Sequence, residues 1–145
     1  MPFRFSLATV LRVRESLQRQ EELKLQKIVF EMARLKRQID QLTADIADAG
    51  NAEERALRRP IPASEVRMLV WTIYAAIEKR AALERDRRTL EEQRDQQLRI
   101  YHAAHRDCET LIDLRDSQRD EYEHEKAHGD QKRLDDMFVA RRQRS

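Results

Sequence analysis

Residues 25–49 read LQKIVFEMARLKRQIDQLTADIADA, and the apolar residues recur at alternating steps of three and four. The stripe consists of Leu25, Ile28, Met32, Leu35, Ile39, Leu42, Ile46 and Ala49. This alternation places eight apolar side chains along one narrow face of a helix, as supercoiled pairs of helices require. The stretch, called the first stripe below, therefore predicts one helix of a coiled coil.

A second stripe with the same spacing follows later in the chain. It consists of Leu69, Ile73, Ala76, Arg80, Leu83, Arg87, Leu90, Arg94, Gln97, Tyr101, Ala104, Cys108 and Leu111. Residues 50–62, GNAEERALRRPIP, lie between the stripes, and Gly and Pro are the residues that end helices. The fold class predicted is all-α, with two long helices forming an antiparallel coiled-coil hairpin. The expected bounds within a single domain (1–145) are a helix over 6–50, a loop over 51–62, a helix over 63–128 or beyond, and a basic tail over 139–145.

The two stripes predict a register for the hairpin. In an antiparallel pair the residue numbers of facing positions have a nearly constant sum. Leu35 facing Leu83 and Ile28 facing Leu90 both give a sum of 118. The helix after about Leu111 then has nothing opposite it.

Arginines in the second stripe need partners for their charge. Arg80 and Arg87 have Glu84 and Glu91 four residues later, one helical turn away. We expect their stems to cover the stripe while their guanidinium groups reach these carboxylates.

Composition narrows the function classes. Charged residues make up 39% of the chain, and 29 basic residues nearly cancel 27 acidic ones. Mixed signs favour solvated helix faces over a nucleic-acid surface, where basic residues should dominate. A single cysteine and the absence of a signal-peptide pattern indicate a soluble, cytoplasmic protein that meets membranes only through partners.

Residues 68–77, MLVWTIYAAI, are apolar on every side of a helix, although one partner helix covers only one stripe. Trp71 and Tyr74 are therefore expected to face a partner or a second copy of the chain. Near the end of the chain, Leu134, Met137, Phe138 and Val139 form either an element that inserts into a partner or a frayed charged tail.

No pattern predicts catalysis. Phosphate-binding loops, nucleophile motifs and cofactor signatures are absent, and a two-helix hairpin has no concave pocket. His102, His105 and Cys108, and separately His124 and His128, have helical spacing but no complete ligand set for a metal. We expect no enzyme activity, no catalytic residue, no metal and no cofactor.

Both ends of the chain resemble the flagellar export protein family FliJ. The opening FRFSLATVLRVR (residues 3–14) is similar to the start of that family, and QKRLDDM (residues 131–137) is similar to its closing segment before a basic tail. The resemblance implies a stalk-like, non-enzymatic coiled coil of the flagellar type III export apparatus. The implied partners are the hexameric flagellar export ATPase, the FlhA export gate at the inner membrane and export chaperones. An injectisome stalk protein and a self-associating structural coiled coil are the alternatives.

Carried over residue by residue, the resemblance implies two binding sites. The ATPase-binding residues would be Phe3, Arg4, Phe5, Leu134, Met137 and Phe138. The gate-binding residues would be Gln38, Leu42, Leu69, Ile73, Ala76 and Arg80, to which the exposed-patch argument adds Trp71 and Tyr74.

Overall fold

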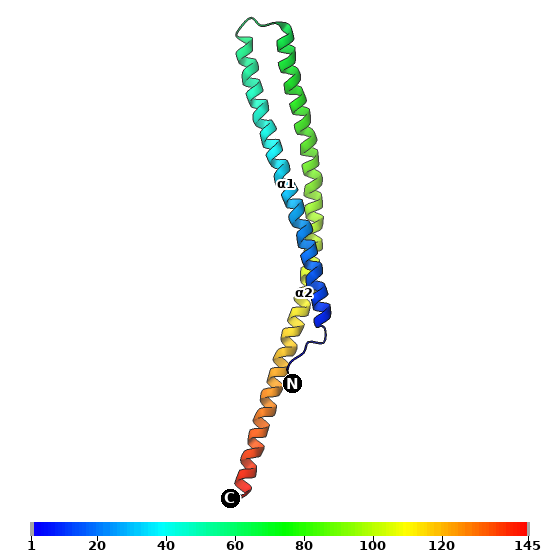
Figure 1. The fold of residues 1–145 in the computed structure, drawn as a ribbon, viewed down its shortest axis with the longest axis vertical. Helices are drawn as coiled ribbons and strands as arrows, with labels where there is room; N and C mark the ends of the chain where they lie inside the picture. The colour runs from blue at the N-terminus through cyan, green and yellow to red at the C-terminus, as the bar shows by residue number, and fades with distance from the viewer. Residues whose placement is uncertain (1, 145) are drawn as a thin grey trace. The chain divides into compact units, whose positions relative to one another are not determined.

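Two helices joined by a short loop make up the computed structural model, which describes residues 2–144 (Figure 1). Helix α1 is Ala8–Leu57 and helix α2 is Ala63–Arg144. No strand occurs among these residues. The predicted all-α helical hairpin is confirmed.

Helix α1 ends at Leu57 rather than at the expected Gly50. Gly50 has no positive φ and stays inside the helix, where glycine costs only about 1 kcal/mol. The residues that follow it, NAEERAL, are mostly strong helix formers. Helix formation stops because Pro60 lacks an N–H group and disfavours helical geometry in the residue before it.

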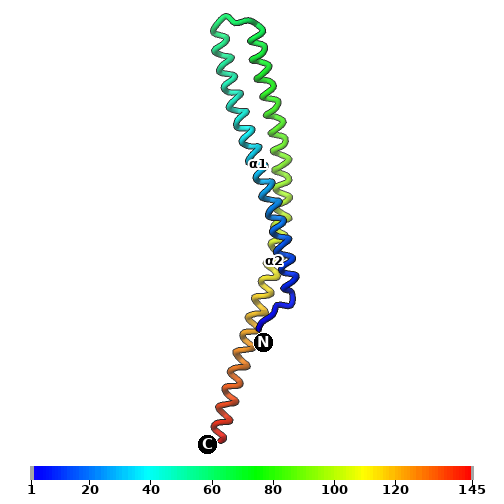
Figure 2. Tube along the Cα trace, viewed as in Figure 1, coloured from blue at the N-terminus to red at the C-terminus, as the bar shows by residue number. Residues whose placement is uncertain are grey.

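The connecting loop is therefore residues 58–62, shorter than the expected 51–62 (Figure 2). Helix α2 begins at residue 63, as expected, and continues through 139–144, where a basic tail was expected. Arginines 141, 142 and 144 occupy the last turn of α2, where positive charge interacts favourably with the helix dipole. Residue 145 of the predicted tail lies outside the described residues.

The chain divides into two compact units, each containing part of both helices. Unit 1 comprises the residues up to Glu21 and those from Tyr101 onwards, and unit 2 comprises Glu22–Ile100. That residues 1–145 form a single coiled-coil domain stays a prediction.

In unit 2 the stripes lie between the helices. Leu35 and Ile39 are buried, and the other first-stripe residues from Leu25 to Ala49 are half-buried. In the second stripe, Gln97 is buried and the positions from Leu69 to Arg94 are half-buried. The spacing of three and four thus identified the faces that pack together.

In unit 1 two side chains are buried at the line of contact between the helices, which we call the seam. Leu11 is 4% exposed and Cys108 is 1% exposed. Burial raises the pKa of the Cys108 thiol, and the nearby carboxylates of Glu15 and Asp107 raise it further. Cys108 is a packed apolar residue with its proton retained.

Contacts between the helices correct the predicted register. Thr43 accepts a hydrogen bond from Arg80 at 3.5 Å in unit 2, and these residue numbers sum to 123. In unit 1, Arg14 contacts Asp107 at 3.4 Å and Gln18 contacts His105 at 3.1 Å, with sums of 121 and 123. Each unit therefore has a register near 122 instead of 118, a displacement of four residues or about 6 Å. The spacing of the apolar residues could not distinguish the two registers, because apolar residues of the two stripes face each other in both.

The seam arginines behave differently from one another. Arg87 places Nε 3.3 Å from Glu84 and 3.7 Å from Glu91, so the predicted ion pair to Glu91 is confirmed. These contacts are ion pairs without hydrogen-bond geometry at Nε. Arg80 turns across the hairpin to Thr43, a contact that the sequence did not indicate.

Candidate partner-binding surfaces

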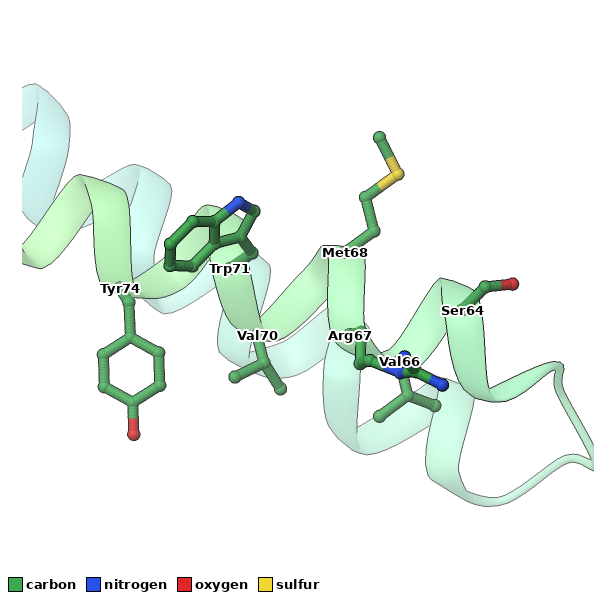
Figure 3. Close-up of a pocket in the computed structure, with 7 residues that line it drawn as sticks. All are labelled: Ser64, Val66, Arg67, Met68, Val70, Trp71 and Tyr74. Atoms are coloured by element: carbon green, nitrogen blue, oxygen red, sulfur yellow. The ribbon is translucent and has the colours of Figure 1, made fainter.

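A large apolar surface lies on α2 shortly after the loop, in unit 2. It consists of Met68, Val70, Trp71, Tyr74 and Ile77 and is called the Trp71 surface below. Trp71 is 76% exposed and Met68 is 73% exposed. Figure 3 shows Met68 projecting from one side of the helix and Val70 and Tyr74 from another.

The exposure of this surface follows from the sequence. Leu69, Ile73 and Ala76 face α1 and are half-buried, so the residues between them must lie on other faces of α2. A shallow hollow runs along part of this surface and is lined by Ser64, Val66, Arg67, Met68, Val70, Trp71 and Tyr74 (Figure 3). Exposed apolar areas with aromatic residues are typical of protein–protein contact sites.

The predicted gate-binding residues do not form one exposed surface. Trp71, Tyr74 and Gln38 are exposed. The remaining five, Leu42, Leu69, Ile73, Ala76 and Arg80, are half-buried at the seam between the helices. Their packing role and a direct partner contact therefore compete for the same side chains.

In unit 1 the extended residues before α1 lie against α2. The ring centroids of Phe3 and Tyr122 are 5.7 Å apart, at an angle of 48° between the rings. The guanidinium carbon of Arg119 lies 5.8 Å from the centroid of Phe3. Phe5 is half-buried and Arg4 is exposed. We call Phe3, Arg119 and Tyr122 the Phe3 cluster.

The Phe3 cluster shows that α2 is covered further along than expected. The sequence predicted nothing opposite α2 after about Leu111, but Arg115, Gln118 and Tyr122 are half-buried. These three positions continue the second stripe at steps of four, three and four. Extending the stripe to Tyr122 would have predicted that this face of α2 is covered.

The end of α2 is exposed throughout residues 130–144. Leu134 and Phe138 are 61% and 67% exposed, and Met137 is exposed to a similar degree. Of the six predicted ATPase-binding residues, Phe3 and Phe5 are thus half-buried, whereas Arg4, Leu134, Met137 and Phe138 face solvent.

Other candidate chemistry is sparse within residues 2–144. No three His, Cys, Asp or Glu side chains gather there in a way that could hold a metal ion. His105 instead contacts Gln18 and stacks on Tyr101, with ring centroids 6.1 Å apart. Neither described helix contains an apolar stretch long enough to cross a membrane.

The sequence model of the family described as "Flagellar FliJ protein" matches residues 3–145. The chain belongs to the FliJ family. The family prediction is therefore confirmed over essentially the whole chain. No curated protein and no solved structure matches the chain.

Membership of the FliJ family implies a component of the flagellar export apparatus that associates with the other export machinery. The family is a structural, non-enzymatic part of that apparatus.

Proposed function

We propose that this FliJ-family chain is a stalk-like coiled coil that links the hexameric export ATPase to the FlhA export gate and contacts export chaperones. The observation that carries the proposal is the presence of two separate exposed apolar surfaces, one in each unit. A chain that binds two machines needs two such surfaces. Its place would be the cytoplasmic face of the inner membrane, where it is held by these partners.

The Trp71 surface is the proposed gate contact. Trp and Tyr supply large contact areas at a low entropic cost, and both are exposed here beside Met68. Gln38 is exposed on α1 within the same unit and belongs to the proposed contact. The half-buried residues Leu42, Leu69, Ile73, Ala76 and Arg80 would support this surface by fixing the pairing of the helices.

The end of α2 is the proposed ATPase contact. Leu134, Met137 and Phe138 are spaced by three and four from the first of them, so they share one face of the helix. Nothing among the described residues covers that face. Arg4 belongs to the same unit and is also exposed, whereas Phe3 and Phe5 would contribute mainly by holding the N-terminal segment against α2.

Mixing the chain with the export ATPase tests this contact. We expect faster ATP turnover and more hexamer, and we expect Leu134→Ala/Phe138→Ala to abolish both effects. Phe30→Ala is the matched control, because Phe30 is 60% exposed but lies in unit 2. Unchanged turnover and unchanged hexamer formation with the unmodified chain would contradict the proposed function.

Self-association is a second candidate, favoured by the exposure of the Trp71 surface. A second copy could cover these side chains as well as a partner could. Sedimentation of the unmodified chain and of Trp71→Ala decides between them. A dimer that Trp71→Ala converts to monomer would assign this surface to self-association, and a monomer at every concentration would leave it for the gate.

A further inference from the structure

We infer that the Trp71 surface binds a single amphipathic helix of the gate, about four turns long, that carries acidic residues beside Arg67 and basic residues beside Glu78. This step rests on the proposed gate contact and adds to it the chemistry of the segment that the gate presents. Two hollows on α2 and two charged side chains that line them carry it.

The Trp71 surface lies on the side of α2 away from α1. Leu69 and Ile73 are half-buried on the face of α2 that packs on α1. Trp71 is two residues from each of them, and two residues turn a helix by about 200°. A partner on this side therefore adds a third helix beside α2 and leaves the seam in place.

Two hollows on α2 join at Trp71. The first, described above, reaches from Ser64 to Tyr74 (Figure 3). The second is lined by Trp71, Tyr74, Ala75, Ile77 and Glu78. Because both hollows share Trp71 and Tyr74, together they follow α2 over residues 64–78, and we call them the Trp71 groove.

The shape of the Trp71 groove fits a helix. Met68, Trp71 and Ala75 follow one another at steps of three and four, and side chains with this spacing form the ridges between which a second helix packs. The groove is about 21 Å long, the length of a helix of roughly four turns. An amphipathic helix with apolar residues at the same steps would cover Met68 and Trp71, which are 73% and 76% exposed.

Opposite charges line the two parts of the groove. Arg67 lines the first hollow and lies nearer the loop than Trp71 (Figure 3), and Glu78 lines the second hollow. Both side chains are exposed, and neither has an ion-pair or hydrogen-bond partner among residues 2–144. Charges beside an apolar contact select the opposite charges on a partner. The segment that fits is therefore acidic at the end beside Arg67 and basic at the end beside Glu78.

A second copy of the chain meets part of this description. An antiparallel copy with Trp71 against Tyr74 also has Arg67 against Glu78, since both pairs of residue numbers sum to 145. The same sum places Arg85 against residue 60, next to Arg59 in the loop of the second copy.

Arg59 and Arg85 are both exposed, and two-fold symmetry would bring these like charges together twice. A separate helix of four turns ends before Arg85. The charges therefore favour a segment of the gate over a second copy.

Titration calorimetry of the full chain with the cytoplasmic part of the FlhA gate tests the inference. Arg67→Glu and Glu78→Arg should each weaken binding by about three- to tenfold. Arg85→Glu and Glu92→Arg are the matched controls, because they lie about five and four whole turns further along α2, on the same face but outside the groove. Their affinities should stay within about twofold of the unmodified chain. Circular dichroism should show unchanged helicity in all four variants, since each position is exposed.

Each other outcome overturns the inference in a distinguishable way. Weaker binding by Arg67→Glu with tighter binding by Glu78→Arg would mean that the partner is acidic along its whole length. Unchanged affinity in both variants, with a loss in Trp71→Ala, would keep the gate contact and remove the charged helix. Unchanged affinity in Trp71→Ala as well would remove the gate contact itself.

Sedimentation equilibrium covers the second copy. The unmodified chain should be monomeric. A dimer that Arg67→Glu and Glu78→Arg each dissociate, and that an equimolar mixture of the two variants restores, would assign the Trp71 groove to self-association and overturn the inference.

Discussion

Phe3 and Trp71 are both aromatic residues near the beginning of a helix, but the structure uses them in opposite ways. Phe3 packs on Tyr122 and beneath the guanidinium of Arg119, so much of its surface is covered within unit 1. Trp71 is 76% exposed in unit 2. The comparison shows that an aromatic residue beside paired helices can pack within the chain or remain available for a partner. The outcome depends on whether side chains of the opposite helix lie against the ring.

Trp71→Ala should have the largest effect of the substitutions that test this difference. Truncating an exposed aromatic residue at the centre of an interface costs about 2 kcal/mol or more, or roughly a 30-fold loss of affinity. Titration calorimetry with the cytoplasmic part of the FlhA gate measures the loss. Helicity should not change, because Trp71 packs against little within the chain.

Phe30→Ala is the matched control for Trp71→Ala. Phe30 is also an exposed aromatic residue of unit 2, but it lies outside the Trp71 surface. Its substitution should leave gate affinity within about twofold. Equal losses for both variants would mean that exposed apolar area in general, and not this surface, determines binding.

The rate of thiol modification should show the second-largest difference between the buried seam of unit 1 and the exposed Trp71 surface. Cys108 is buried and its pKa is raised, so its modification should be much slower than that of a cysteine placed at Trp71→Cys in a Cys108→Ser background. The rate for Cys108 should also rise with pH at a higher midpoint. Stopped-flow modification with a chromogenic disulfide reagent measures both differences. A range of roughly pH 6–10 covers the titration of an ordinary thiol.

The same pKa shift has a consequence for stability, with a definite sign. The folded state retains the proton of Cys108 to higher pH than the unfolded state does, so it binds more protons in that interval. The stabilising contribution is present below the ordinary thiol pKa and is lost as pH rises through the raised value. Cys108→Ala should remove this alkaline component from the pH dependence of the unfolding free energy. An unchanged alkaline slope in that variant would contradict the assignment.

Phe3→Ala should destabilise the chain moderately, by about 1–2 kcal/mol, because it removes a ring pair and half-buried apolar area. Urea unfolding followed by circular dichroism measures the change. Phe138→Ala removes an equally large but exposed ring from the same unit and should change the unfolding free energy by less than about 0.5 kcal/mol. Equal effects would show that Phe3 is not held against α2 in solution.

Arg119→Gln should have the smallest effect. It removes the cation above the Phe3 ring and keeps part of the stem, so the expected cost is about 0.5–1 kcal/mol. In the Phe3→Ala background the same substitution should cost nothing further, because the ring is no longer there. A double-mutant cycle from urea unfolding gives this coupling directly, and additive costs would contradict the contact.

The sequence predicted the helices and the faces that pack together. Apolar residues that recur at alternating steps of three and four all lie on one face of a helix, and that face is the one that packs. It failed at Gly50, because a glycine that is tolerated inside a helix and one that ends a helix look alike without knowledge of the backbone. The register was wrong for a related reason. Apolar pairing permits two solutions, and contacts such as Gln18 with His105 depend on side-chain reach that spacing does not encode.

The candidate surfaces were predicted unevenly. The exposure of Trp71 and Tyr74 followed from the crowding of apolar residues over 68–77, and the structure agrees. The role of Phe3 did not follow, because Tyr122 lies 119 positions away and the second stripe was not extended that far. The family resemblance supplied residues such as Ile73 and Ala76, whose burial at the seam a resemblance alone does not reveal.

The exposed end of α2 has a consequence for backbone dynamics. Residues 130–144 form a helix with every residue solvent-exposed, so its amide hydrogen bonds are protected only by local helix formation. Their protons should exchange with deuterium far sooner than those around Leu11 or Leu35, which open only with larger parts of the fold. A partner bound to this end would slow that exchange, so the exchange rate of residues 130–144 reports whether the end of α2 is occupied.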